Sequence, residues 1–228
     1  MTSLSDNLYL LTPEFALAGL AFLVFTVDLL LPEGRKIYLA WLSMAGLIAL
    51  MVVSLVMLWD EQESLYDGLL AVDDFSLFFK VLFMGIGVFI ILSSMDFVHA
   101  KLKHQGEFYG LLLFSILGMN VMAQSRELLT AYIALELLSF SLYVMVAHAK
   151  DSAKSNEGAL KYIIVGAVSS AILLYGVSMV YSTLGVTKFE DIAAGLATAY
   201  EVSPALWVGV GLILVGLMFK VSVAPFHM

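Results

Sequence analysis

Two ionisable residues, Glu136 and Lys220, lie inside long apolar stretches where a charge is costly. Glu136 stands within residues 128–141, about nine residues and roughly 13 Å of helix from the nearer end of that stretch. A charged side chain at the centre of a bilayer costs about 2.5–3.5 kcal/mol on insertion scales. A protonated acid that bonds to a neighbouring helix is one interpretation. We favour the other, a role in a proton or ion pathway.

Lys220 precedes Pro225 by five residues in a run that ends with His227. Pro225 has no N–H, and its ring crowds the carbonyl of Val221, so the helix is expected to break just after Lys220. Broken helices with ionisable groups are typical of transporter sites. The alternative is a lysine that extends to the membrane edge. His227 could join a proton path, because histidine titrates near neutral pH.

Lys161 lies about one turn inside a third apolar stretch. Its position favours a side chain that extends to the interface. The residues after it are small, and Gly166 and Ser170 form a small-xxx-small pair that permits close helix packing. That helix is therefore expected inside a bundle, where Lys161 could face the interior.

Three other charged residues receive a structural interpretation. Lys80 begins an apolar stretch and is expected to anchor it at the interface. Glu14 and Asp28 lie near the two ends of the first stretch, where capping and interfacial placement are favoured over chemistry. His99 and His104 are expected in a solvated loop, and His148 at the end of a helix.

The composition places the whole chain in a membrane. Apolar residues form 61% of the 228 residues and charged residues 13%, against about 25% charged in an ordinary soluble domain. This excludes a soluble enzyme and a nucleic-acid binder. The formal net charge of −8 argues against a phosphate-binding surface, and the absence of cysteine excludes thiolate metal sites. With no metal-ligand spacing and no glycine-rich loop, we expect no cofactor or metal in this chain.

The apolar stretches predict an all-α fold, a polytopic membrane helix bundle within a single transmembrane domain, residues 1–228. Backbone groups find no hydrogen-bond partners in lipid, so long apolar runs must be helical. A shorter mixed segment near 187–200 is expected to form an interfacial helix. The seven expected spans are residues 10–31, 38–59, 75–95, 108–124, 127–148, 158–184 and 204–224, the last broken near Pro225.

The basic residues predict the orientation of these spans. The loops after the first, third and fifth spans hold six Lys and Arg residues, and the loops after the second, fourth and sixth hold two. Because basic loops stay in the cytoplasm, the N-terminus and residues 60–74 are expected outside and residues 149–157 inside.

Three motifs together resemble the antiporter-like membrane subunits of respiratory complex I, most of all subunit N of bacterial NADH-quinone oxidoreductases. The first is the mid-helix Glu-Leu-Leu-Ser that begins at Glu136. The second is Glu157-Gly-Ala-Leu-Lys161-Tyr with the small residues that follow it. The third is the Lys-Val-Ser-Val-Ala-Pro-Phe-His run that begins at Lys220. The resemblance covers essentially the whole chain.

The resemblance implies a role for each matching residue. Glu136, Lys220 and Lys161 would form a proton relay, and Glu107 would match the acid that opens the fourth helix. Family members contain two inverted repeats after a leading segment. Here residues 1–107 would be the leading three helices and residues 108–228 part of the first repeat. The chain therefore resembles an N-terminal portion of such a subunit.

The resemblance also implies an assembly. The chain would translocate protons in the inner membrane of a bacterium, beside other membrane subunits, while quinone and NADH react elsewhere in the complex. It would carry no redox centre. Two alternatives stay open: a subunit of a multisubunit sodium/proton antiporter, and a structural subunit that transports nothing.

Overall fold

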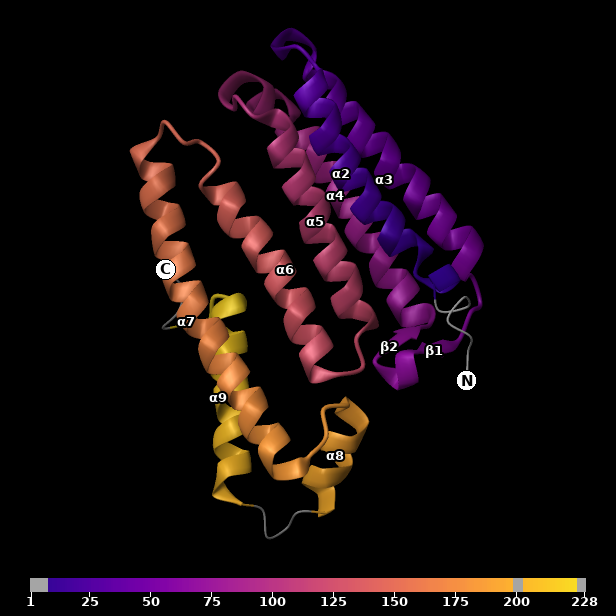
Figure 1. The fold of residues 1–228 in the computed structure, drawn as a ribbon, viewed down its shortest axis with the longest axis vertical. Helices are drawn as coiled ribbons and strands as arrows, with labels where there is room; N and C mark the ends of the chain where they lie inside the picture. The colour runs from indigo at the N-terminus through magenta and orange to yellow at the C-terminus, as the bar shows by residue number, and fades with distance from the viewer. Residues whose placement is uncertain (1–7, 199–202, 225–228) are drawn as a thin grey trace.

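The computed structural model describes residues 8–198 and 203–224, which form a bundle of long helices (Figure 1). Six of the described helices are long and apolar enough to cross a membrane, and α9 is a shorter apolar helix. The all-α membrane bundle predicted from the sequence is therefore confirmed. The helices are α2 (Thr12–Leu30), α3 (Ile37–Leu58), α4 (Asp74–Lys101), α5 (Gln105–Gln124), α6 (Leu128–Val146), α7 (Ala153–Leu184), α8 (Phe189–Thr198) and α9 (Pro204–Lys220).

The helix ends follow from local sequence signals. Asp73 and Ser76 form a reciprocal capping box at the start of α4. Ser152 caps α7, and Gly185, directly after the last residue of this helix, has a left-handed conformation with φ of 71°. Helix α9 begins at Pro204 and ends at Lys220, as the position of Pro225 led us to expect. Pro225 itself lies outside the described residues.

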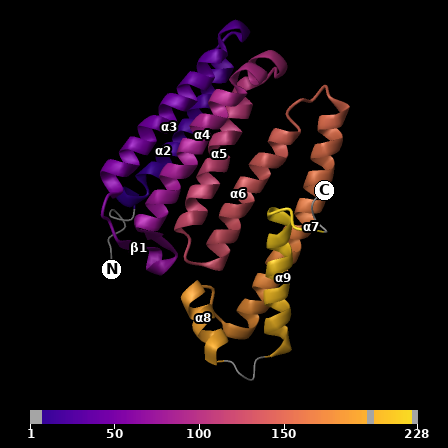
Figure 2. The ribbon, with the colours of Figure 1, turned by 180° about the vertical axis from the view of Figure 1, so that it is seen from behind.

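Helices α2 to α5 share the main apolar core. Leu17, Leu47, Met84, Ile91 and Ile116 are among its fully buried members. Large apolar side chains also cover the outer faces of these helices. Water-soluble bundles avoid such surfaces, whereas helices embedded in lipid require them. Helix α6 packs on α5, and α7 packs chiefly on α9 (Figures 1 and 2).

A short β-hairpin, which the sequence pattern did not predict, lies at one end of the bundle. Strand β1 (Glu63–Leu65) pairs antiparallel with β2 (Leu70–Val72), and Asp67 in the turn between them has a φ of 57°. Backbone bonds join the hairpin to the two following loops of the same end. Arg126 N–H donates to Leu69, and Phe189 N–H donates to the carbonyl of Arg126.

The same end positions the start of α6. Glu127 caps the helix by accepting hydrogen bonds from the backbone and hydroxyl of Thr130. Burial alone would raise the pKa of Glu127, but the hydrogen bonds from Thr130 and Thr187 outweigh it and lower the pKa below its ordinary value. The cap therefore stays ionised at neutral pH and complements the positive helix end.

Candidate functional site

Glu136 and Lys220 meet where α6, α7 and the end of α9 converge. Lys220 Nζ lies 3.5 Å from Glu136 Oε1, and the two side chains are 12% and 14% exposed. Helix α9 stops at Lys220, so the lysine occupies a helix end, and α9 lies beside α7 (Figure 1). The structure thus brings together the two residues that the sequence singled out first.

Two serine hydroxyls complete the cluster. Ser170 donates to Glu136 Oε1 at 2.6 Å and accepts from Lys220 Nζ at 3.3 Å, while Ser139 accepts from Lys220 at 2.7 Å. A hydroxyl donates and accepts at once. Ser170 therefore joins the carboxylate and the ammonium in a continuous hydrogen-bonded chain.

An aromatic residue closes one side of the cluster. The ring of Tyr143 lies 5.9 Å from Lys220 Nζ, within the range of a cation–π interaction. Tyr162 packs against Tyr143 edge to face, with ring centroids 4.6 Å apart. A side chain at Gly166 would collide with the Tyr143 hydroxyl, since a Cβ there would lie 2.1 Å from it. Gly166 thus leaves the space in which Tyr143 stands.

Close packing of α7 and α9 sets the position of Lys220. A Cβ at Gly216 would lie 2.5 Å from Leu173 Cβ, so the helices approach more closely than alanine would allow. Ser169 donates a hydrogen bond to the Gly216 carbonyl at 2.9 Å. These contacts lie one turn before Lys220 and fix the end of α9 against α7.

The sequence did not assign roles to Ser139, Tyr143 and Ser170. The signal was present in the spacing, because Glu136, Ser139 and Tyr143 stand at i, i+3 and i+7 on one helix face. The expected interior face of the helix that carries Gly166 and Ser170 is found, since both residues are buried.

The remaining predicted relay residues do not join this cluster directly. Lys161 is 73% exposed and pairs with Glu157 at 2.6 Å, so its side chain points away from the bundle interior. The possibility that Lys161 faces the interior is not realised, because the i,i+4 pair with Glu157 holds it on the outer face. Glu107 lies near Lys150, 3.5 Å away, at one end of the bundle. His227 lies outside the described residues.

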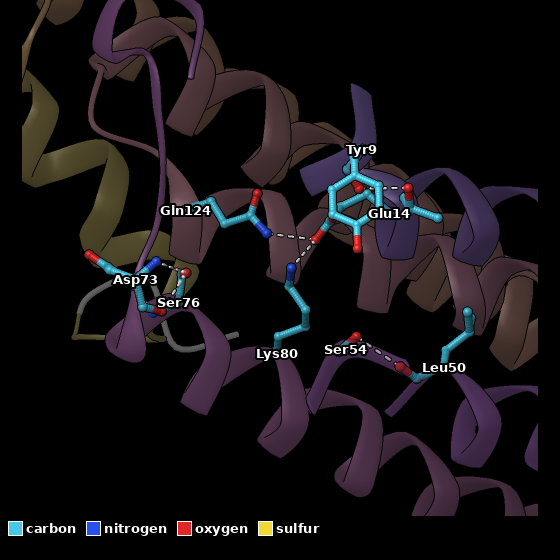
Figure 3. A network of polar contacts seen from close by, with 9 residues as sticks. Tyr9, Glu14, Leu50, Ser54, Asp73, Ser76, Lys80 and Gln124 are labelled. Atoms are coloured by element: carbon cyan, nitrogen blue, oxygen red, sulfur yellow. Dashed lines mark hydrogen bonds and ion pairs between the residues drawn. The ribbon is translucent and has the colours of Figure 1, made fainter. Parts of the chain in front are cut away.

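A second buried ion pair joins α2, α4 and α5. Lys80 Nζ lies 2.7 Å from Glu14 Oε1, and Gln124 Nε2 donates to the same oxygen at 2.6 Å (Figure 3). The side chain of Lys80 is 0% exposed. The prediction that Lys80 extends to the interface as an anchor is therefore wrong, whereas Glu14 lies in the first turn of α2, the helix-end position that the sequence favoured. Helices α2 and α4 both pack on α5, and each supplies the partner that lets the other's charge be buried.

Two smaller expectations can be compared with the structure. Asp28 pairs with Lys36 at 3.1 Å near the end of α2, which agrees with interfacial placement. His99 lies in the last turn of α4 and not in a loop, because α4 extends to Lys101. Among the described residues, no three His, Cys, Asp or Glu side chains are grouped as metal ligands.

Comparison with known proteins finds one matching family and several similar chains. The family described as "NADH:quinone oxidoreductase/Mrp antiporter, TM" matches residues 125–228, the part that holds both Glu136 and Lys220. NADH-quinone oxidoreductase subunit N of Trichlorobacter lovleyi is 35% identical over 97% of this chain, and that of Moorella thermoacetica is 38% identical over 97%. The chain spans about half the length of these relatives, 46% of each.

Solved structures agree with the fold. A chain of respiratory complex I from Thermus thermophilus, solved with bound aureothin, superimposes with a TM-score of 0.74 at 28% identity. The match covers 95% of this chain and 45% of that one. A chain of the Mrp complex from Dietzia shares the fold at 20% identity, with a TM-score of 0.73 over 95% of this chain and 24% of its own. This multi-pass membrane chain is therefore similar, over nearly its whole length, to the subunit N proteins of NADH-quinone oxidoreductases, and its residues 125–228 match the membrane family that those enzymes share with Mrp antiporters.

Proposed function

We propose that the chain carries protons across a bacterial inner membrane as part of an NADH-quinone oxidoreductase. The observation that carries the proposal is the cluster of Glu136, Ser170, Ser139 and Lys220, joined by contacts of 3.5 Å or less. The relatives named as subunit N of that enzyme supply the assembly and the reaction. The chain itself would bind neither NADH nor quinone.

The chemistry of the cluster suits reversible proton binding. Removal from water favours the neutral form of a lysine, whereas a nearby carboxylate favours the charged form. At 3.5 Å from Glu136, Lys220 experiences both effects, and they oppose each other. A small change in the separation of the pair or in its hydration then decides whether Lys220 holds its proton.

Ser170 gives the proton a direct route between the two groups. Its hydroxyl contacts Glu136 on one side and Lys220 on the other. When Lys220 releases a proton to the hydroxyl, the hydroxyl can pass its own proton to the carboxylate. The position of Lys220 at a helix end supports this proton route. Backbone that leaves a helix at membrane depth is tolerated only where it contacts protein or water, and water at the helix end could exchange protons with Lys220.

The other parts of the proposal rest on the family resemblance. Lys161, Glu107 and His227 would connect the cluster to bulk water, with Lys161 and Glu107 near the end that carries the basic loops. The N-terminus would face the periplasm, by the distribution of basic residues. Residues 1–107 would form the leading segment and residues 108–228 part of the first repeat, packed against other membrane subunits of the complex.

The test is proton pumping by the assembled enzyme with Glu136→Gln or Lys220→Arg. Glutamine keeps the shape of Glu136 without its charge, and arginine stays protonated at every accessible pH. We expect normal assembly and quinone reductase activity that no longer builds a proton gradient. Glu190→Gln, at an exposed position on α8 outside the proposed proton path, is the matched control for a lost carboxylate.

Two outcomes would contradict the proposal. Native pumping by the Lys220→Arg enzyme would show that Lys220 acts only through its charge. Native pumping by both variants would favour a structural subunit. The sodium/proton antiporter alternative, which the family description includes, predicts rescue of a sodium-sensitive strain without any dependence on quinone.

A further inference from the structure

A cavity of 450 Å³ lies at the end of the bundle opposite the β-hairpin. The last turn of α4 and the connection to α5 form one wall, including Phe97, Lys101 and Leu102. The connection from α6 to α7 forms the other, including His148 and Lys150. This end carries the basic loops, so in the predicted orientation the cavity lies at the cytoplasmic surface of the bilayer.

The cavity is positively charged although the whole chain is acidic. Lys101, Lys103 and Lys150 line it, and Asp151 is the acidic lining residue. Lys103 lies 2.7 Å from Asp151. The hydrogen bond and charge of Lys103 lower the pKa of Asp151 below its ordinary value, so each neutralises the other. Lys150 lies 3.5 Å from Glu107, which does not line the cavity, so Lys101 supplies the net positive charge and Lys150 can face a ligand as well as Glu107.

A buried histidine adds a second, independent observation. His148 lines the cavity and is 7% exposed. Its Nε2 lies 2.8 Å from the carbonyl oxygen of His104, which can only accept, so Nε2 carries the hydrogen. Among the described residues, Nδ1 of His148 has no hydrogen-bond partner. A buried polar atom of this kind calls for a donor such as a hydroxyl.

The apolar part of the wall points to a lipid. Phe97 and Lys101 stand at i and i+4 on one face of α4, and Phe97 is 58% exposed on the surface of the span. The ring is placed for acyl chains, and the ammonium one turn further is placed for a headgroup phosphate. Basic pockets of this kind on the cytoplasmic side are typical of anionic lipid headgroups.

We propose that this cavity binds one anionic phospholipid that carries a headgroup hydroxyl, such as phosphatidylglycerol. The phosphodiester lies between Lys101 and Lys150, the hydroxyl donates to Nδ1 of His148, and the acyl chains leave along Phe97. This site is separate from the Glu136–Lys220 cluster, so it stands or falls independently of proton transport.

Native mass spectrometry of the protein in neutral detergent tests the site. Phosphatidylglycerol is expected to stay bound, whereas phosphatidylcholine of the same acyl length and inorganic phosphate are not. A double variant, Lys101→Gln with Lys150→Gln, should weaken phosphatidylglycerol binding about thirtyfold, since each basic residue near a membrane surface contributes about fivefold. The matched control is Arg35→Gln with Lys154→Gln, which removes two charges from the same end outside the cavity.

Each other outcome decides against the proposal. An equal loss in the control variant would show only a general attraction of anionic lipid to this end. Equal binding of phosphatidylcholine, or competition by inorganic phosphate, would overturn the lipid assignment. Phosphatidylmethanol keeps the phosphodiester but lacks the hydroxyl and should bind several-fold more weakly. Equal binding of that lipid would overturn the role of His148.

Discussion

Replacing only one residue of the buried pair Lys80 and Glu14 should lower the free energy of unfolding far more than replacing both. At 2.7 Å and an effective dielectric constant of about 20, the attraction between two unit charges is about 6 kcal/mol. Desolvation of the two ions offsets most of that gain. The net contribution of the pair is therefore small, but either ion alone is left uncompensated in a site that excludes water.

Protonation limits the cost of each single change. In Lys80→Met, Glu14 keeps Gln124 as a partner and can take up a proton. Protonating an ordinary glutamate at pH 7 costs about 4 kcal/mol, and deprotonating an ordinary lysine costs about 5 kcal/mol. We expect Lys80→Met to lose about 3–4 kcal/mol and Glu14→Gln about 3–5 kcal/mol. The double variant, with no charge left, should stay within about 1 kcal/mol of the native protein.

The assay is reversible unfolding in mixed micelles with increasing sodium dodecyl sulfate, followed by the fluorescence of the three tryptophans, Trp41 on α3, Trp59 at its C-terminal cap and Trp207 on α9. Lys161→Met is the control, since its exposed pair contributes at most about 1 kcal/mol. If the two single changes simply added in the double variant, the pair would not act as a unit and the reasoning would fail.

Two further predictions concern topology and the packing of the site. Ser64 and Ala153 are exposed at opposite ends of the bundle. A cysteine at Ser64 should react with an impermeant thiol reagent added from outside, and a cysteine at Ala153 should not. The reverse labelling pattern would show the opposite orientation. Gly166→Ala should displace Tyr143, cost about 1–3 kcal/mol and slow proton transfer. Gly158→Ala, where a Cβ meets only Val146 at 3.9 Å, should change neither property, and equal activity of the two variants would refute a role for Tyr143.

The sequence was sufficient for the helices and for the central pair. Lipid forces long apolar runs into helices, so composition alone determines the fold class. The isolation of Glu136 in an apolar run and the spacing from Lys220 to Pro225 are local features, and the structure brings these two residues together. The short helix near residues 187–200 was also predicted, and it is found as α8.

The sequence failed where the answer depends on which helices are neighbours. Lys80 lies near the end of a span, where a lysine that extends to the interface and a lysine in a buried ion pair give the same sequence pattern. Only the packing of α2 and α4 on α5 distinguishes these two settings. The hairpin escaped prediction because its strands have three residues each, too few for a period to show. Ser170 acquires its role only through contacts with two other helices.

Because α7 is long, the thickness of the bilayer determines how well Lys161 is hydrated. Its 32 residues span about 48 Å, whereas the hydrocarbon layer is about 30 Å thick. With equal overhang at both ends, Lys161, the ninth residue of the helix, lies about 3 Å below the hydrocarbon edge and reaches the headgroups together with Glu157. A thicker membrane draws that pair into hydrocarbon and separates Lys161 from water, whereas a thinner one keeps it hydrated.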